Sequence, residues 1–294
     1  MRAPVSSSIQ AQEAAFRDLR RQRRTTTLTG VAVLAVLLAA AAWMSEFRPS
    51  ALIGGAPRIG EYFSKVLPSL EWANLLAGPE TEGSIAFWFY RLDTWLLLLF
   101  ETAQMAAIAT LMGASAALLL AFPAAKNLGA PNWVFQLTRR VLEATRTVPE
   151  IVFALIFVWA FGVGALAGIL AIALHTTGAL GKLFADAMEN VELRPWDGVR
   201  ASGGTWFEGC RFAVLPAAAP DLLSYAMLRF EVNLRSASVI GFVGAGGIGE
   251  ELYKVISFNY YEEISAIILL IIFAVMLIDM TSERLRRRVI EAVT

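Results

Sequence analysis

The segment 239–249, VIGFVGAGGIG, is rich in glycine, and the spacing of its glycines is typical of a ligand-binding turn. Gly244, Gly246 and Gly249 fit G-x-G-x-x-G, the pattern that holds the pyrophosphate of a dinucleotide. That turn needs a preceding strand, a following helix and an acidic residue about 20 positions on, inside a βαβ unit. Glu262 and Glu263 fall in range, but apolar membrane-length stretches flank the site. A membrane dinucleotide-dependent oxidoreductase is therefore the weaker alternative.

The same glycines favour a break in a membrane helix. Each glycine weakens a helix by about 1 kcal/mol relative to alanine. Irregular backbone at membrane depth survives where it is buried in protein or lines a wet cavity. A tight packing elbow and a gate on a translocation path are both compatible with this pattern. The gate or helix-break residues are Gly241, Gly244, Gly246, Gly247 and Gly249.

A charged segment, LRFEVNLRSASVIGF at 228–242, precedes the glycines. Such charges at bilayer depth cost a few kcal/mol and tend to face the bundle interior. On a helix Glu231 and Arg235 are i,i+4 neighbours, as are Arg229 and Asn233. One interpretation is an internal Glu231–Arg235 pair that locks helices together. The alternative is that Arg229 or Arg235 attracts an anion in transit, and snorkelling to the interface is a third. A planar guanidinium suits tetrahedral oxyanions such as phosphate or phosphonate.

Four isolated polar residues occur elsewhere in apolar surroundings. His175, the single histidine, is typical of a helix-packing hydrogen bonder rather than a ligand. Glu101 and Gln104 either face a cavity or satisfy neighbouring backbone. Glu150 follows a proline at a predicted helix start, where its carboxylate favours the positive end of the helix dipole.

The polar stretch 186–216, DAMENVELRPWDGVRASGGTWFEGCRFAVLP, carries local turn signals. Residues 185–191 have helical character, and Pro195 is typical of the first turn of a second short helix. Gly203 and Gly204 predict a turn, and Thr205 is suited to cap the helix that follows. We therefore expect a short helix–turn–helix that a partner protein can push.

The composition sets the class of protein. Of 294 residues, 57% are hydrophobic and 17% charged, and mean hydropathy is +0.58. Ordinary soluble domains are about 45–50% apolar and about 25% charged, so this is a membrane protein. A net charge of zero gives no reason to expect a nucleic-acid partner. The single cysteine, Cys210, excludes an internal disulfide, and no Cys/His cluster predicts a metal site.

Long apolar runs and their basic flanks predict the topology. Runs at 28–44, 94–122, 148–180, 214–241 and 264–280 are long enough to cross, and the first is interpreted as an uncleaved anchor rather than a secretory signal. Five arginines lie at 17–24, and further basic residues lie at 123–147 and 284–288. The positive-inside rule puts all three segments in the cytoplasm, which requires two crossings within 148–180, one of them short or tilted.

The predicted fold is therefore an all-α polytopic membrane protein with about six transmembrane helices and both termini cytoplasmic. The expected parts are a basic tail at 1–27, an anchor helix at 28–45, and an extracytoplasmic loop at 46–92 with an interfacial helix near 58–74. A transmembrane domain at 93–283 contains a cytoplasmic loop at 181–213, and a basic tail follows at 284–294. Without an internal repeat, a second copy can complete a central pathway.

The cytoplasmic loop resembles a known family. Permease subunits of binding-protein-dependent ABC importers carry E-A-A, three residues, G, nine residues, I-x-L-P. The register matches in full, although Asp, Gly and Val replace the first triplet and Ala213 replaces Ile. The stretches 146–157, 173–187 and 223–249 look like the phosphonate-transporter subfamily. The matching loop residues are Asp197, Gly198, Val199, Gly203, Leu215 and Pro216.

The resemblance implies a type I, MetI-like permease fold and a division of labour. Two copies form the pathway in the inner (plasma) membrane of a bacterium. Two cytoplasmic ATPase subunits, which bind ATP and Mg²⁺, grip the loop, while this chain binds no cofactor itself. An extracytoplasmic phosphonate-binding protein delivers phosphonate, phosphite or phosphate. A permease for another small anion or an amino acid, and an autonomous channel or secondary transporter, are the transport alternatives.

Overall fold

The computed structural model describes residues 5–291, and every regular element in this range is a helix, which confirms the all-α prediction. The ends of the two predicted basic tails, residues 1–4 and 292–294, lie outside the described range. The chain forms two compact units, residues 1–64 and 65–294.

The first unit consists of α1 (Val5–Met44) and most of α2 (Pro49–Val66). The part of α1 from Phe16 to Met44 is long and apolar enough to cross a membrane. The predicted anchor is therefore the second half of a longer helix, and the arginine-rich tail continues it because arginine is a good helix former. Helix α2 begins well before the interfacial helix expected at 58–74.

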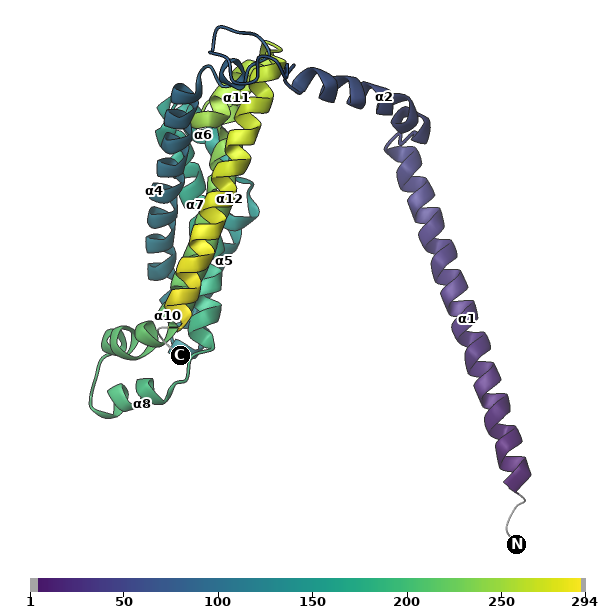
Figure 1. The fold of residues 1–294 in the computed structure, drawn as a ribbon. Coiled ribbons are helices and arrows are strands. Elements are labelled where there is room, and N and C mark those ends of the chain that lie inside the picture. Colours follow the sequence, from purple (N-terminus) through teal and green to yellow (C-terminus); the bar gives the residue numbers. More distant parts are fainter. Residues whose placement is uncertain (1–4, 292–294) are drawn as a thin grey trace. The chain divides into compact units, whose positions relative to one another are not determined.

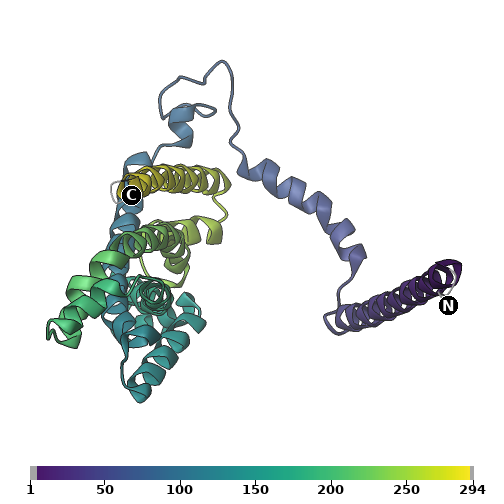
Figure 2. The same cartoon turned by 90° about the horizontal axis from the view of Figure 1, so that it is seen from below.

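Helix α7 (Ala165–Glu189) is the central element of the second unit (Figures 1 and 2). It packs against α4 (Leu92–Ala124), α5 (Asn132–Thr147), α6 (Glu150–Phe161) and α10 (Leu215–Ile240). Helix α12 (Tyr261–Glu291) packs against α10.

Small residues allow α4 and α7 to approach closely. A Cβ added to Gly113 would lie 2.7 Å from the Cβ of Thr176 on α7. Close backbone approach of this kind is how membrane helices gain packing energy without a hydrophobic driving force. The buried small residues of α4 recur every three to four positions: Ala106, Ala109, Gly113, Ala117, Ala121 and Ala124.

The segment 123–147, expected to be a cytoplasmic loop, is mostly helical. A 3₁₀ turn, η1 (Lys126–Leu128), is followed by α5, which buries Leu142 against Gly181 of α7. Helix α6 has 12 residues, about 18 Å, which is too short to cross a bilayer alone. Helices α5 and α6 together therefore form the segment that runs antiparallel to α7, and this segment is broken at Val148 and Pro149.

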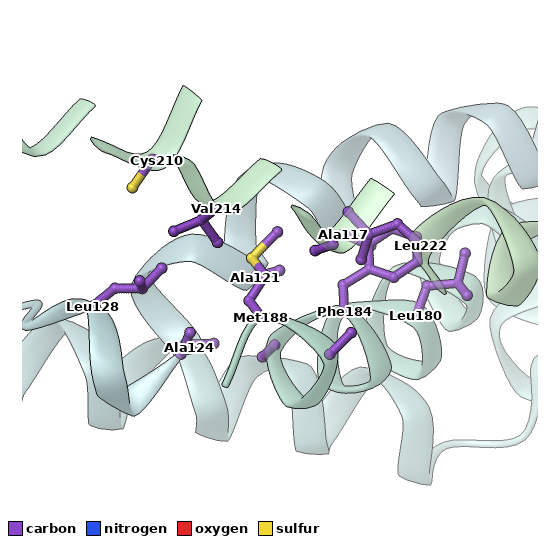
Figure 3. Packing of buried hydrophobic residues seen from close by; sticks show 14 of the residues in the cluster. Ala117, Ala121, Ala124, Leu128, Leu180, Phe184, Met188, Cys210, Val214 and Leu222 are labelled. Carbon is purple, nitrogen blue, oxygen red and sulfur yellow. The ribbon is translucent and has the colours of Figure 1, made fainter. Parts of the chain in front are cut away.

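The second unit has two distinct ends. At one end, called the α8 end, α8 (Arg194–Ala201) packs against α9 (Trp206–Gly209), which is hydrogen-bonded to η1, and the last turns of α12 reach the same end (Figure 1). At the other, the α11 end, α3 (Ile85–Trp88) and α11 (Gly247–Ser257) contact the first turns of α12. Figure 3 shows the apolar cluster of the α8 end, in which Leu128, Met188 and Val214 come together from three elements.

Within residues 16–288, four helices are long and apolar enough to cross a membrane: parts of α1 and α12, and all of α4 and α7. Helix α10 is long but carries three charged side chains in its second half. These charges make α10 the helix on which a polar route through the bundle can be sought.

Candidate functional site

A capped helix pair forms the α8 end. The Thr205 side chain accepts from the Glu208 backbone N–H, while the Glu208 carboxylate accepts from the Thr205 backbone N–H, 2.7 Å away. This capping box confirms the predicted cap. The two hydrogen bonds from Thr205 hold the pKa of Glu208 below its ordinary value. The turn before the cap has Gly203 at φ +88°, a conformation that favours glycine.

The residues of the matched motif lie on this helix pair. Asp197 is in the first turn of α8, and it and Gly198 are exposed, whereas Val199 packs against the Gly204 position. Trp196 fixes α8 on α9, because a Cβ at Gly209 would lie 2.6 Å from its ring. The Trp206 indole donates a 2.8 Å hydrogen bond to the carbonyl of Leu128. The pair is thereby attached to the bundle while its tip stays free.

The helix pair runs directly into α10. A π-helical segment, η2 (Cys210–Val214), joins α9 to α10 without a loop, and Leu215 and Pro216 form the first turn of α10. Cys210 is buried there, and burial raises the pKa of its thiol to about 11. Single-turn π segments are often found at functional sites. Because no loop interrupts the chain between α9 and α10, the junction mechanically connects the α8 end to the charged part of α10.

A polar network crosses the centre of the bundle. The Arg229 guanidinium forms a 2.8 Å ion pair with Glu150 at the start of α6. Arg229 also reaches the Thr176 hydroxyl at 3.4 Å, and Thr176 donates to the buried Asn233 side chain at 3.1 Å. Asn233 in turn donates to the Thr110 hydroxyl at 2.8 Å. Four helices, α4, α6, α7 and α10, are thus linked by side chains at membrane depth.

The network corrects the expected pairing of charges. Among the described residues Glu231 and Arg235 form no ion pair with each other, and the ion pair that links α10 to another helix is Glu150–Arg229. The two residues are one turn apart on α10 without reaching ion-pair distance: Arg235 is exposed, whereas Glu231 is half-buried near Asp279 and Arg286 of α12 as well as Arg235. The interhelical pair was missed because the sequence suggested a role for Glu150 only at a helix dipole.

The remaining isolated polar residues have identifiable surroundings. His175 Nδ1 lies 3.0 Å from the Val148 carbonyl, and its Nε2 lies 3.5 Å from Glu150. The histidine therefore bonds across the break between α5 and α6, as predicted for a packing residue. Glu101 lines a cavity of about 240 Å³ with Gly246, whereas Gln104 is exposed on α4.

The glycine segment forms a compact elbow between α10 and α11. Gly241 begins a 3₁₀ turn, and Gly244 and Gly246 have φ values of +83° and +82°. Gly247 and Gly249 are in the first turn of α11 rather than in a break. A Cβ at Gly249 would lie 1.9 Å from the Ser238 carbonyl oxygen, so the segment is a close-packed elbow.

The elbow lies below the α11 end of the bundle. The Ile248 N–H donates to Thr102 on α4, about 15 Å along that helix from Leu92. The surroundings do not suit a dinucleotide, because helices and 3₁₀ turns, not a strand, flank the glycines. Within the described residues, no cluster of three or more His, Cys, Asp or Glu could hold a metal ion.

Comparison with known proteins gives the family. The model of the binding-protein-dependent transport system inner membrane component family matches residues 113–293. The phosphite transport system permease protein PtxC of Stutzerimonas stutzeri is 36% identical over 255 residues, covering 87% of this chain and 86% of that protein. The phosphate-import permease protein PhnE of Mycolicibacterium smegmatis is 34% identical over 246 residues, 84% of this chain but 43% of that protein.

Solved structures agree on the fold. A chain of the inward-facing MetNI methionine ABC transporter superposes with a TM-score of 0.58 at 19% identity, covering 68% of this chain and 97% of that chain. The expected type I, MetI-like permease architecture is confirmed. The family match covers well over half of the sequence, including the helix pair, the elbow and every member of the network except Thr110. This chain belongs to the binding-protein-dependent transport system inner membrane components, the multi-pass permease subunits of bacterial ABC importers.

Proposed function

We propose that this chain is the permease subunit of an ATP-driven importer for phosphonate, phosphite or phosphate-like oxyanions. The observation that carries the proposal is the capped α8–α9 pair, which projects from the bundle and continues into α10. A rigid element with a free tip can receive force, and a continuous helix can transmit it to the membrane centre.

The tip has the surface that a protein partner requires. Phe207 on α9 is 78% exposed and Asp197 on α8 is exposed, so an apolar side chain and a charge are presented together. Such an exposed aromatic is typical of an interface anchor. The partner is a pair of cytoplasmic ATPase subunits that bind ATP and Mg²⁺, while this chain contributes no nucleotide site. The coupling residues are Asp197, Gly198, Val199, Gly203, Leu215 and Pro216.

The sidedness of the α8 end follows from its basic residues. Arg139 pairs with Glu189 beside η1, and Arg140 lies next to it on α5. The arginines at 284–288 lie in the last turns of α12. Because cytoplasmic flanks are rich in Lys and Arg, this end faces the cytoplasm. The α11 end then faces an extracytoplasmic binding protein, and the glycine elbow near it is suited to act as the outer gate.

The pathway and cargo follow from the membrane centre and the relatives. Two copies of the chain enclose the pathway, to which the charged segment of α10 contributes Arg229, Glu231, Asn233 and Arg235. Relatives named for phosphite and phosphate transport support a phosphorus oxyanion as cargo. Guanidinium groups suit such anions because their planar donors match two oxygens at once.

Reconstitution tests this function. We expect the chain, purified with its ATPase and binding-protein subunits and placed in liposomes, to take up phosphonate, phosphite or phosphate only with ATP and Mg²⁺. Preference for sulfate or an amino acid would refute the cargo, and uptake that persists without the ATPase would refute the ATP-driven mechanism. Replacing Gly203 by leucine should uncouple ATP hydrolysis from uptake, whereas Gly198→Ala should not, because it places the alanine of the family pattern at an open helical position.

A further inference from the structure

Among the described residues of the second unit, none covers one face of α10, and this face carries a charge. Leu228, Val232 and Val239 are 38%, 40% and 54% exposed. Their spacing of four and seven residues places them on a single helix face. Arg235 falls on the same face and is also exposed. An apolar surface of this kind would suit lipid, but the arginine within it does not.

Arg235 lies near the centre of the membrane-spanning bundle. Its neighbour Asn233 bonds to Thr110, which is about 27 Å along the roughly 50 Å length of α4. Helix α10 ends at Ile240, where the glycine elbow begins. The elbow lies at the level of Thr102 on α4, so α10 ends inside the bundle and short of the α11 end. More than a full helical turn separates Arg235 from either end of α10. Beyond Ile240, the bundle continues toward the α11 end. The side chain therefore cannot escape to an interface by extending along the helix.

Arg235 also differs from Arg229 in its partners. Arg229 is neutralised by Glu150 and anchored by Thr176. Within the described residues no carboxylate lies within ion-pair distance of Arg235, and Glu231, one turn before it on α10, is close to Asp279 and Arg286 as well as to Arg235. A cation at this depth that faces lipid costs several kcal/mol, so such residues face a water-filled cavity or an opposite charge.

We propose that the face of α10 formed by Leu228, Val232, Arg235 and Val239 lines a hydrated passage, and that Arg235 is the residue that contacts the oxyanion in transit. This inference rests on the proposed function and assigns the substrate contact within it. The passage lies between this face and a second copy of the chain. Arg229, the other candidate, is a positioning residue that holds α6 against α10.

A lone arginine suits passage rather than storage. Its planar donors can bind two oxygens of a phosphonate, phosphite or phosphate at once. The side chains of Val232 and Val239 offer no further hydrogen bonds, so each copy of the chain holds the anion through one group and the anion can leave. Conduction requires binding that is favourable enough to enter and weak enough to exit.

Cysteine labelling tests the hydrated passage in the assembled complex. In a Cys210→Ser background, Val232→Cys and Val239→Cys should react with a membrane-impermeant cationic methanethiosulfonate. The rate should exceed by about tenfold or more that of Phe273→Cys, an exposed position on α12 within the apolar run, because thiols ionise in water and not in lipid. Saturating phosphite should slow the reaction of both α10 variants. Equal, slow rates at all three positions would refute a hydrated face.

Charge substitution tests the contact itself. We expect Arg235→Gln to raise the KM for phosphite uptake about tenfold or more, the loss typical of a charge-assisted hydrogen bond. Arg235→Lys, which keeps the positive charge, should recover part of this loss. If the wild-type complex transports phosphite and Arg235→Gln leaves the KM for phosphite unchanged, this inference alone is refuted. A wild-type complex that transports no phosphorus oxyanion would instead refute the proposed function.

Discussion

The ion pair at the membrane centre gives the sharpest prediction for stability. Glu150→Gln keeps the size of the side chain but removes its charge, which leaves Arg229 without a counter-ion. Both side chains are largely buried, with 17% and 15% of their surfaces exposed. At 2.8 Å, an effective dielectric constant of 20 gives about 6 kcal/mol of attraction, part of which desolvation offsets.

We therefore expect Glu150→Gln to destabilise the protein by about 3 kcal/mol, since breaking a buried pair from one side leaves an uncompensated charge. The matched control is Glu231→Gln on α10, which removes a carboxylate that pairs with no cation in the described structure. Its cost should stay below about 1 kcal/mol, as for weakly paired charges. The double variant Glu150→Gln with Arg229→Gln should recover stability relative to Glu150→Gln.

Detergent-induced unfolding, followed by tryptophan fluorescence, measures these differences. A positive recovery in the double-mutant cycle would isolate the coupling between the two side chains. The reasoning is refuted if Glu231→Gln costs as much as Glu150→Gln, because the pair within α10 would then be the important one. It is refuted equally if the double variant is no more stable than Glu150→Gln.

Three further predictions concern the helix pair. Gly203→Ala should destabilise the helix pair by about 1–2 kcal/mol, because alanine resists positive φ. Gly198→Ala, at an open helical position, should instead stabilise α8 by about 0.5–1 kcal/mol. Thermal unfolding compares the two variants, and equal effects would contradict the turn geometry. Because the pKa of Glu208 is lowered, its capping interaction contributes its full stability above the ordinary pKa of 4.5, and this stability is lost as the pH falls through the lowered pKa. Proteolysis of the helix pair should accelerate in that pH range. Thr205→Ala should abolish this pH dependence. Cys210 should resist alkylation at pH 8 until the protein unfolds, since its pKa is about 11, and rapid modification of the native protein would contradict its burial.

Local signals in the sequence were sufficient for the helix pair. Proline, glycine and threonine each act within a few residues, so Pro195, Gly203 and Thr205 predicted the start, the turn and the cap that the structure contains. The glycine segment was also predictable as an irregularity, because five glycines weaken any helix. Whether it opens as a gate depends on motion that neither spacing nor composition reveals.

Long-range pairing was beyond the sequence. Glu150 and Arg229 are 79 residues apart, so their contact depends on how α6 and α10 pack around α7. The i,i+4 spacing of Glu231 and Arg235 suggested a closer partner, but the two side chains stay beyond ion-pair distance, and Glu231 also lies near Asp279 and Arg286 of α12. Helix α5 was mistaken for a loop because its arginines suggested a solvated segment, although Thr138 and Leu142, four residues apart, form its buried face.

The central claim is that the α8–α9 pair is the cytoplasmic contact for a separate ATPase. The most direct measurement is labelling of Ser202→Cys, at the exposed turn, with an impermeant thiol reagent in a Cys210→Ser background. We expect reaction in inside-out membranes but not in intact cells, with protection when the ATPase subunits are bound. Reaction from the outside of intact cells, or an unchanged rate in the presence of the ATPase, would contradict it.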